Sequence, residues 1–335
     1  MANYPNKLPI LYCCLAFALL LVPNLAPSNQ PQARGRSYRV GVLTVLMADR
    51  PHITGLRDGL RMAGYVEGEN LTLAIPKGKS PHSLRAAAST YISERKDVIV
   101  ATGNSEAQIA SEMTHEIPIV FLPASDPVGA GFVKSFARPG KNLTGVTYYT
   151  DSRDVGKPLE IFKEVFPALR KTVLLTDARS EAPIDSASTE AIRSVATHLG
   201  VGLKEIPVTK LEQAERFVSA LSKQSVDGIL INCSSLFWNI EKIGALSRQK
   251  LIPLYGCSRA QVMQDGALFT FAPDMYQLGR RGAWYVDRIL KGANPADLPV
   301  ETPRTFEFVV NLNTADAIGI KIPPEVLQRA DRVIK

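Results

Sequence analysis

Short apolar runs alternate with helical patterns through most of this chain, and residues 97–122 show the alternation most clearly. A β-branched run, Asp97 to Ala101, is followed by a helical pattern and then by a second apolar run, Ile117 to Leu122. Strand, helix and strand in this order indicate a βαβ unit of a parallel sheet. Ligands of such sheets bind at the carboxyl ends of the strands. The polar loops that follow the two runs, 102–105 and 124–127, are therefore the first candidates for a binding site.

The same alternation continues on both sides of this stretch. We expect further strands within residues 38–46, 70–75, 143–149, 172–176, 203–208, 226–232, 252–255, 267–271 and 306–311. Helical spacing of apolar residues lies between them, within residues 56–63, 84–95, 158–165, 186–199, 211–223, 236–249 and 276–291. A chain of 335 residues exceeds one ordinary domain. We therefore predict an α/β fold of two doubly wound parallel-sheet lobes, with a hinge and a ligand cleft between them. The first lobe would comprise residues 38–149 and 273–299, and the second residues 150–272 and 300–335.

The first 28 residues are typical of a secretory signal peptide. Lys7 is followed by a nearly unbroken apolar run from Leu8 to Val22, and Pro23 follows at once. As a helix this run would span roughly 22 Å, less than the about 30 Å of a bilayer's hydrocarbon core. We predict a cleaved signal peptide over residues 1–28, a linker over residues 29–37 and a soluble, periplasmic mature protein. The alternative is an uncleaved N-terminal anchor.

Charge and motifs argue against several classes of function. The pI is about 9.2, but the basic residues are scattered and form no run with aromatic residues, so we expect no nucleic-acid partner. The four histidines share no ligand spacing, and we expect no metal site. A nucleophile elbow, a phosphate-binding loop and a complete dinucleotide fingerprint are all missing from the sequence. We predict a monomeric binding protein that uses no cofactor and is not an enzyme.

The candidate ligand-binding residues lie in loops that follow the predicted strands. The first lobe would supply Thr44, Asp49, Thr102, Gly103, Asn104, Ser105, Ser125 and Asp126. The second lobe would supply Asp177, Asn232, Ser234 and Tyr255, with Tyr148 near the hinge. Hydroxyl and amide groups suit a carboxylate or amide ligand, and Tyr148 could stack on a planar group.

The acidic members of this set have alternative roles. Asp49 and Asp177 could grip an amine, or each could cap the helix that follows it. Asp126 is placed to cap a helix with Pro127 in its first turn.

Two of the four cysteines remain after the predicted cleavage. Cys233 and Cys257 each follow a predicted strand of the second lobe. If those strands are neighbours, the two could lie within the Cα separation of about 4.4–6.8 Å that a disulfide needs. We expect two buried thiols, with the disulfide as the alternative.

Several ordered motifs together resemble the ABC transporter substrate-binding protein family that includes tryptophan/tyrosine-type binding proteins. These motifs are Ile117-Pro118-Ile119-Val120-Phe121, Ser125-Asp126-Pro127-Val128-Gly129, Arg138-Pro139-Gly140, Asn142-Leu143-Thr144-Gly145-Val146, Gly64-Tyr65-Val66-Glu67-Gly68 and Phe306-Glu307-Phe308-Val309-Val310-Asn311. The resemblance covers roughly residues 38 to 335. It implies a type I periplasmic-binding-protein fold with three crossovers.

The resemblance also implies a function. The protein would capture a small polar ligand, such as an amino acid, an aromatic compound or a carboxylate, and would deliver it to an ABC permease and its ATPase. The alternatives are an exported ligand sensor for a membrane receptor and a hydrolase that uses the same cleft. The family often places an acidic residue near the position of Ser234, where this chain has Asn-Cys-Ser-Ser. That departure weakens the expectation of an α-amino group bound by the second lobe.

Overall fold

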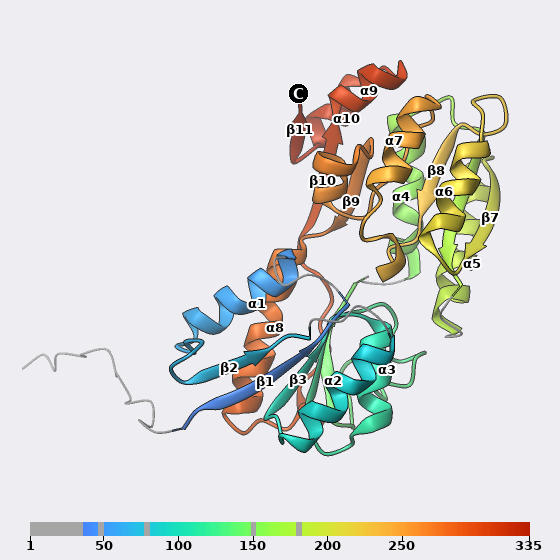
Figure 1. The fold of residues 1–335 in the computed structure, drawn as a ribbon. Coiled ribbons are helices and arrows are strands. Elements are labelled where there is room, and N and C mark those ends of the chain that lie inside the picture. The colour runs from blue at the N-terminus through green and yellow to red at the C-terminus, as the bar shows by residue number, and fades with distance from the viewer. Residues whose placement is uncertain (1–35, 46–49, 77–80, 149–151, 179–182) are drawn as a thin grey trace, which may run out of the picture. The chain divides into compact units, whose positions relative to one another are not determined.

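The computed structural model describes residues 36–45, 50–76, 81–148, 152–178 and 183–335 (Figure 1). The predicted signal peptide and most of the predicted linker lie outside the described residues, as does Asp49. Among the helices within the described ranges, none combines the length and apolar character needed to cross a membrane.

The first sheet contains five parallel strands. Its order is β2 (Leu71–Ala74), β1 (Tyr38–Leu43), β3 (Val98–Ala101), β4 (Ile119–Ala124) and β5 (Leu143–Thr147). All residues of β3, β4 and β5 are buried. This explains the unbroken apolar runs in the sequence, because a parallel sheet is covered on both faces.

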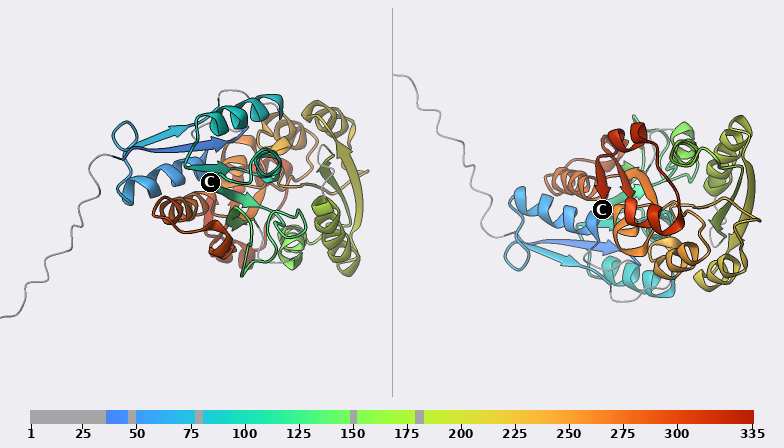
Figure 2. Two further views of the ribbon diagram at one scale, coloured as in Figure 1. Left: turned by 90° about the horizontal axis from the view of Figure 1, so that it is seen from below. Right: turned by 90° about the horizontal axis from the view of Figure 1, so that it is seen from above.

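Two pairs of helices cover the faces of this sheet (Figures 1 and 2). One apolar cluster joins strand residues to α1 (Pro51–Met62) and α8 (Met275–Leu290), and another joins them to α2 (Pro81–Ser93) and α3 (Asn104–Met113). The side chains of β3 alternate between the two clusters, as the period of two in a strand requires. Because α8 belongs to this layer, the chain returns to the first sheet late in the sequence.

The second lobe holds two groups of three strands. One is β7 (Gly202–Val208), β6 (Lys171–Asp177) and β8 (Gly228–Ile231), all parallel. The other is β11 (Arg332–Ile334), β10 (Phe306–Asn311) and β9 (Phe269–Pro273), in which β9 and β10 are antiparallel. Two single bridges, Ile229 to Leu254 and Tyr255 to Phe269, connect the groups. The strand predicted within residues 252–255 is therefore reduced to these bridges, and the sheet of this lobe is mixed.

The helices of the second lobe are α4 (Ser152–Val165), α5 (Pro183–His198), α6 (Leu211–Ala220), α7 (Glu241–Gln249), α9 (Leu312–Ile318) and α10 (Pro324–Arg329). They follow the predicted order up to α7, and α9 and α10 were not predicted. The helix predicted over residues 236–249 is divided into a short 3₁₀ turn, Ser235–Phe237, and α7. A π-helical turn, Gln261–Asp265, belongs to the same lobe, and a 3₁₀ turn, Pro295–Asp297, packs against the first sheet, where the backbone N–H of Gly140 donates to the carbonyl of Ala296. The predicted α/β architecture is confirmed, while the exact lobe boundaries stay a prediction.

The prediction of a helix after Asp126 is wrong. Residues 127–131 form turns, and the carboxylate Oδ1 of Asp126 accepts a hydrogen bond from the backbone N–H of Gly129 at 2.8 Å. Gly131 follows with φ of 70° in the left-handed region, which stops helical propagation. Asp126 thus caps a turn and not a helix.

Candidate ligand-binding site

One pocket gathers the carboxyl ends of strands from both lobes. Thr102 follows β3, Ser125 follows β4, Asp177 is the last residue of β6, and Asn232 follows β8. All four line the pocket, as expected for a parallel α/β sheet. The apolar part of its lining consists of Pro123, Val155, Pro158, Leu174, Ile192, Leu230 and Ile231, and aromatic side chains are contributed by Tyr148, Trp238 and Tyr255.

Ten of the thirteen predicted ligand-binding residues line this pocket. They are Thr102, Gly103, Asn104, Ser105, Ser125, Tyr148, Asp177, Asn232, Ser234 and Tyr255. Thr44 is fully buried behind the end of β1, and neither it nor Asp126 belongs to the lining. Asp49 lies outside the described residues. Asp177 is the last residue of β6 and lines the pocket.

Two polar side chains in the first-lobe wall of the pocket are hydrogen-bonded to the backbone of the same lobe. The side-chain Oδ1 of Asn104 accepts a hydrogen bond from the backbone N–H of Ser125 at 2.9 Å, which ties the loop after β3 to the loop after β4. The hydroxyl of Thr102 donates to the carbonyl of Leu43 at 3.3 Å. Ser105, in contrast, is exposed and lies in the first turn of α3. Asn104 and Thr102 therefore shape the wall, and Ser105 presents a hydroxyl to the pocket.

Glu106 also lines the pocket, and the sequence analysis missed it. It is the third residue of α3 and is only 1% exposed. Its Oε1 accepts a hydrogen bond from the backbone N–H of Val45 at 3.3 Å. The sequence does hold a signal for this position. Glu106 lies in the first turn of a helix that follows a strand-end loop, and side chains there point back toward the helix N-terminus and the site.

Acidic groups dominate the charge of the pocket. Asp177 is 7% exposed, so the wall holds a buried carboxylate from each lobe. Lysine, arginine and histidine are absent from the lining within the described residues.

The second lobe contributes two polar atoms that the protein does not satisfy. Oδ1 of Asn232 and Oγ of Ser234 are buried and have no hydrogen-bond partner. An unsatisfied buried polar group costs about 1–3 kcal/mol. Both residues line the pocket, so a ligand could supply the missing partners.

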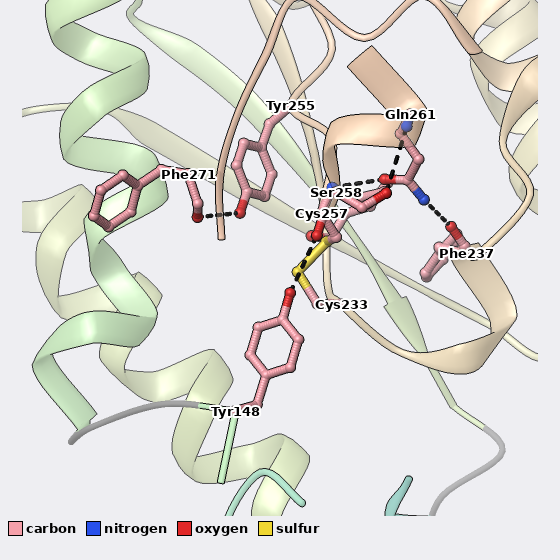
Figure 3. Close-up of a disulfide and its surroundings, with 9 residues drawn as sticks. Tyr148, Cys233, Phe237, Tyr255, Cys257, Ser258, Gln261 and Phe271 are labelled. Atoms are coloured by element: carbon pink, nitrogen blue, oxygen red, sulfur yellow. Dashed lines mark hydrogen bonds between the residues drawn. A yellow bond between two sulfur atoms is a disulfide. The ribbon is translucent and has the colours of Figure 1, made fainter. Parts of the chain in front are cut away.

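The expectation of two separate thiols is wrong, because Cys233 and Cys257 form a disulfide (Figure 3). The bridge between Ile229 and Leu254 makes the segments before the two cysteines neighbours, and the Cα atoms are 5.4 Å apart. Cys233 lines the pocket, and the hydroxyl of Tyr148 donates to the carbonyl of Cys257 at 3.2 Å. The disulfide is therefore part of the pocket wall.

Comparison with known proteins decides the family. The sequence profile of the family described as ABC transporter substrate binding protein matches residues 40–334. The chain belongs to this family. The resemblance noted in the sequence is thus confirmed.

Individual proteins are similar to this substrate-binding protein in sequence or in fold. A "Tyrosine-binding protein" of Clostridioides difficile (strain R20291) is 25% identical over 307 residues, which cover 89% of this chain and 86% of the relative. A conserved domain protein from Vibrio cholerae is 29% identical with a TM-score of 0.82, covering 89% of this chain and 100% of its own. A domain from Streptococcus pneumonia, solved in complex with L-Trp, has a TM-score of 0.80 at 23% identity with the same coverage of both chains. The two solved structures confirm the two-lobed type I periplasmic-binding-protein fold.

An aromatic contact lies beside the pocket of this substrate-binding protein. The ring of His52, near the start of α1, lies 5.8 Å from the ring of Trp238, measured between centroids. His52 is fully buried, and neither ring nitrogen has a hydrogen-bond partner. Burial, aided by the positive charge of Arg50, lowers the pKa of His52 to about 3. The imidazole is therefore neutral at physiological pH, and it serves as packing for Trp238.

Proposed function

We propose that this protein is an exported, non-enzymatic solute-binding protein that captures an aromatic α-amino acid in the pocket between its lobes. The observation that carries the proposal is the pair of buried carboxylates, Glu106 and Asp177, in the pocket wall. Among the described residues, no lysine, arginine or histidine lines the same pocket. Such a wall favours a ligand that brings a positive charge.

The ammonium group of the ligand would occupy the acidic part of the pocket. A buried carboxylate loses hydration, and an ammonium ion at hydrogen-bond distance offsets part of that loss in a medium of low dielectric constant. The unsatisfied atoms of Asn232 and Ser234 add acceptors on the second lobe. These acceptors take over the role of the acidic residue that the family often places near Ser234.

The remaining groups of an amino acid also find partners in the pocket. The hydroxyls of Ser105 and Ser125 can donate to a carboxylate. Tyr148 and Tyr255 use their hydroxyls to bond Cys257 and Phe271, so they offer rings to the ligand. With Trp238 they form an aromatic surface that suits an indole or phenol side chain. The names of the tyrosine-binding relative and of the structure with L-Trp support the same ligand class.

Membership in the substrate-binding protein family supports delivery of this ligand to an ABC permease and its ATPase. Export to the periplasm follows from the predicted signal peptide. The protein would act as a monomer that encounters the permease from outside the inner membrane.

A thermal-shift series with matched analogues tests the ligand class. The probes are L-tryptophan, L-tyrosine, tryptamine, which lacks the carboxylate, and indole-3-propionate, which lacks the amine. We expect L-tryptophan or L-tyrosine to raise the melting temperature, since a ligand at a hundredfold excess over its Kd adds about 2.7 kcal/mol. Indole-3-propionate should lose most of the effect because it leaves both carboxylates without the ammonium, whereas tryptamine should keep part of it.

The reverse order of the two analogues would contradict the assignment of the acidic wall to the amine. Consumption of a stabilising probe during incubation, followed by chromatography, would identify an enzyme instead. Loss of ligand uptake in cells that lack the protein, with uptake restored by its expression, tests the transport step.

A further inference from the structure

The Cys233–Cys257 disulfide joins a segment that lines the ligand pocket to a segment that is hydrogen-bonded to Tyr148 of the first lobe. Cys233 lies between Asn232 and Ser234, which carry the unsatisfied atoms of the pocket. Cys257 carries the carbonyl that accepts the hydrogen bond of Tyr148, a residue that directly follows the last strand of the first sheet. The disulfide thus connects residues 232–237, here called the ligand loop, with the segment whose Cys257 carbonyl accepts the hydrogen bond of Tyr148 (Figure 3).

The ligand loop is also held at its two ends. At the first end, the backbone N–H of Asn232 donates to the carbonyl of Leu175 at 3.0 Å. At the second end, the side-chain Nε2 of Gln261 donates to the carbonyl of Phe237 at 2.5 Å. Gln261 is 1% exposed, and its Oε1 accepts from the backbone N–H of Cys257 at 2.6 Å. The disulfide ties the loop between these anchors.

We propose that the disulfide is a positioning element of the ligand pocket, and that ligand affinity depends on its redox state. Breaking it would release Cys233 and its neighbours, while Gln261 would still hold Phe237 and the segment at Cys257. The reduced protein would therefore stay folded with a loosened ligand loop. Asn232 and Ser234 would have to be ordered again on binding, and this ordering has an entropic cost.

Cys233 belongs to the pocket lining and is only partly buried, so a reagent would approach the disulfide from the pocket. A dithiol reduces it by ordinary exchange: one thiolate attacks a sulfur, a mixed disulfide forms, and the second thiol closes the reagent into a ring. The cystine receives two electrons and two protons from the dithiol, the bond between the two sulfurs breaks, and two thiols result. A bound ligand that covers Cys233 would oppose this reaction.

Amide hydrogen exchange in the unliganded protein is the first arm of the test. The reporters are the N–H groups of Asn232 and Phe237, which donate to the carbonyls of Leu175 and Ser234. We expect the Phe237 amide, whose acceptor Ser234 lies in the released stretch, to exchange at least tenfold faster after dithiol treatment, and the Asn232 amide at the anchored end to change less. The N–H of Ile99, bonded to the carbonyl of Pro118 in the first sheet, should be unchanged. Unchanged exchange of the Phe237 amide would overturn the proposal whatever the ligand is.

Calorimetric titration is the second arm, and it rests on the proposed function. The probes are L-tryptophan and L-tyrosine, added to oxidised protein, to dithiol-reduced protein and to a Cys233→Ala, Cys257→Ala double variant. We expect at least tenfold weaker binding to the last two, and no further effect of the dithiol on the double variant. By thermodynamic linkage, a saturating probe should then lower the reduction potential of the disulfide by about 30 mV for each tenfold difference in affinity.

The two arms separate this proposal from the proposed function. Equal affinity of a probe for the oxidised and reduced proteins overturns the role of the disulfide and leaves the ligand class standing. Failure of both probes to bind oxidised protein contradicts the proposed function, and the amide exchange still decides whether the disulfide holds the ligand loop. Global unfolding of the reduced protein, seen as fast exchange at Ile99 as well, also contradicts a local positioning role.

Discussion

Single residues of the pocket wall differ in whether the protein itself uses their polar groups. Asn104 bonds the backbone at Ser125, so its amide supports the loops of the first lobe. Asn232, an identical side chain on the second lobe, has a buried oxygen with no partner. Because an unsatisfied group costs free energy in the unliganded state and regains it on binding, Asn232 is the better candidate for ligand recognition. Residue type alone does not distinguish the two.

Replacing Asp177 by asparagine should weaken ligand binding. The change removes the negative charge at the end of β6 and keeps the shape of the side chain. A hydrogen bond to a charged group contributes about 1.5–3 kcal/mol, so we expect a ten- to hundredfold higher Kd for the amino acid found in the screen. Calorimetric titration measures the effect.

Asp126→Asn is the matched control for this variant. Asp126 is absent from the pocket lining and caps a turn, so its replacement should leave the Kd unchanged. A larger loss of affinity for Asp126→Asn than for Asp177→Asn would show that the acidic wall has been misplaced.

His52 should make the stability of the protein depend on pH. Burial lowers its folded-state pKa from 6.5 to about 3. Between these values the unfolded chain binds a proton and the folded protein does not, so stability falls as the pH drops from 6.5 towards 3. The slope approaches about 1.4 kcal/mol per pH unit once the pH is well below 6.5. The total loss of stability between pH 7 and pH 5 is therefore about 2 kcal/mol.

Urea unfolding of the wild type and of His52→Leu at these two pH values checks the prediction. Leucine has a similar volume, and it removes two buried nitrogens that have no partner. The variant should lose about 2 kcal/mol less than the wild type on acidification. Equal losses for the two proteins would mean that His52 is not the responsible group.

At the scale of elements, the contact between α1 and α8 holds the late helix on the first sheet. Glycines bring the two backbones close together: a Cβ at Gly55 would lie 2.1 Å from the carbonyl oxygen of Tyr276, and one at Gly279 would lie 2.1 Å from that of His52. Such distances exclude any side chain unless the backbones separate. The close approach fixes the position of α8, and through α1 it places His52 beside Trp238.

Two glycines of α8 should respond differently to alanine. Gly279→Ala forces the backbones of α1 and α8 apart, and overpacking of this kind costs about 1–3 kcal/mol. At Gly282 the added Cβ would lie 2.7 Å from Cδ2 of Leu122, the end of a flexible side chain. Gly282→Ala should therefore cost less than half as much, because the leucine side chain can move whereas the backbone facing Gly279 cannot.

Denaturant unfolding of the two variants at pH 7 compares these costs. If Gly282→Ala proves the more destabilising, then the tight contact lies against β4 and not between the helices.

At the scale of the whole molecule, the pocket exists only because distant parts of the chain meet. Its lining comes from strands, helices and loops between residues 102 and 238 and from Tyr255. Late in the sequence, α8 packs on the first sheet, and β10 then pairs with β9 in the second lobe. Two lobes that share a pocket in this way can enclose a ligand by a change in their relative orientation.

The export of the whole chain can be tested directly. The apolar run of residues 8–22 ends at Pro23, so the mature protein should begin between about residues 26 and 36. Intact mass and N-terminal sequencing of periplasmic protein give this position. The same sample should contain no reactive thiol after denaturation without reductant, because Cys233 and Cys257 are bonded to each other. Full-length chain in the membrane fraction would instead indicate an uncleaved anchor.

Local patterns in the sequence were enough to predict most elements and the edge at which the site lies. The apolar runs predicted β1, β3 and β4, and the loops after them were the predicted site loops. This worked because hydrophobic period and strand-end position are properties of short segments. The tight turn at Asp126 was missed, since the same Asp-Pro pair can begin a helix or a turn, and the outcome depends on the conformation at Gly131.

Sequence by itself thus determined the α/β class, most of the elements up to β10 and ten of the residues that line the pocket. Only the tertiary structure decided the pairing of Cys233 with Cys257, the entry of Glu106 and Trp238 into the wall, and the internal use of Asn104. Each of these depends on which segments become neighbours across a sheet or between lobes. Packing over the whole chain determines which segments become neighbours, so a short stretch of sequence does not predict them.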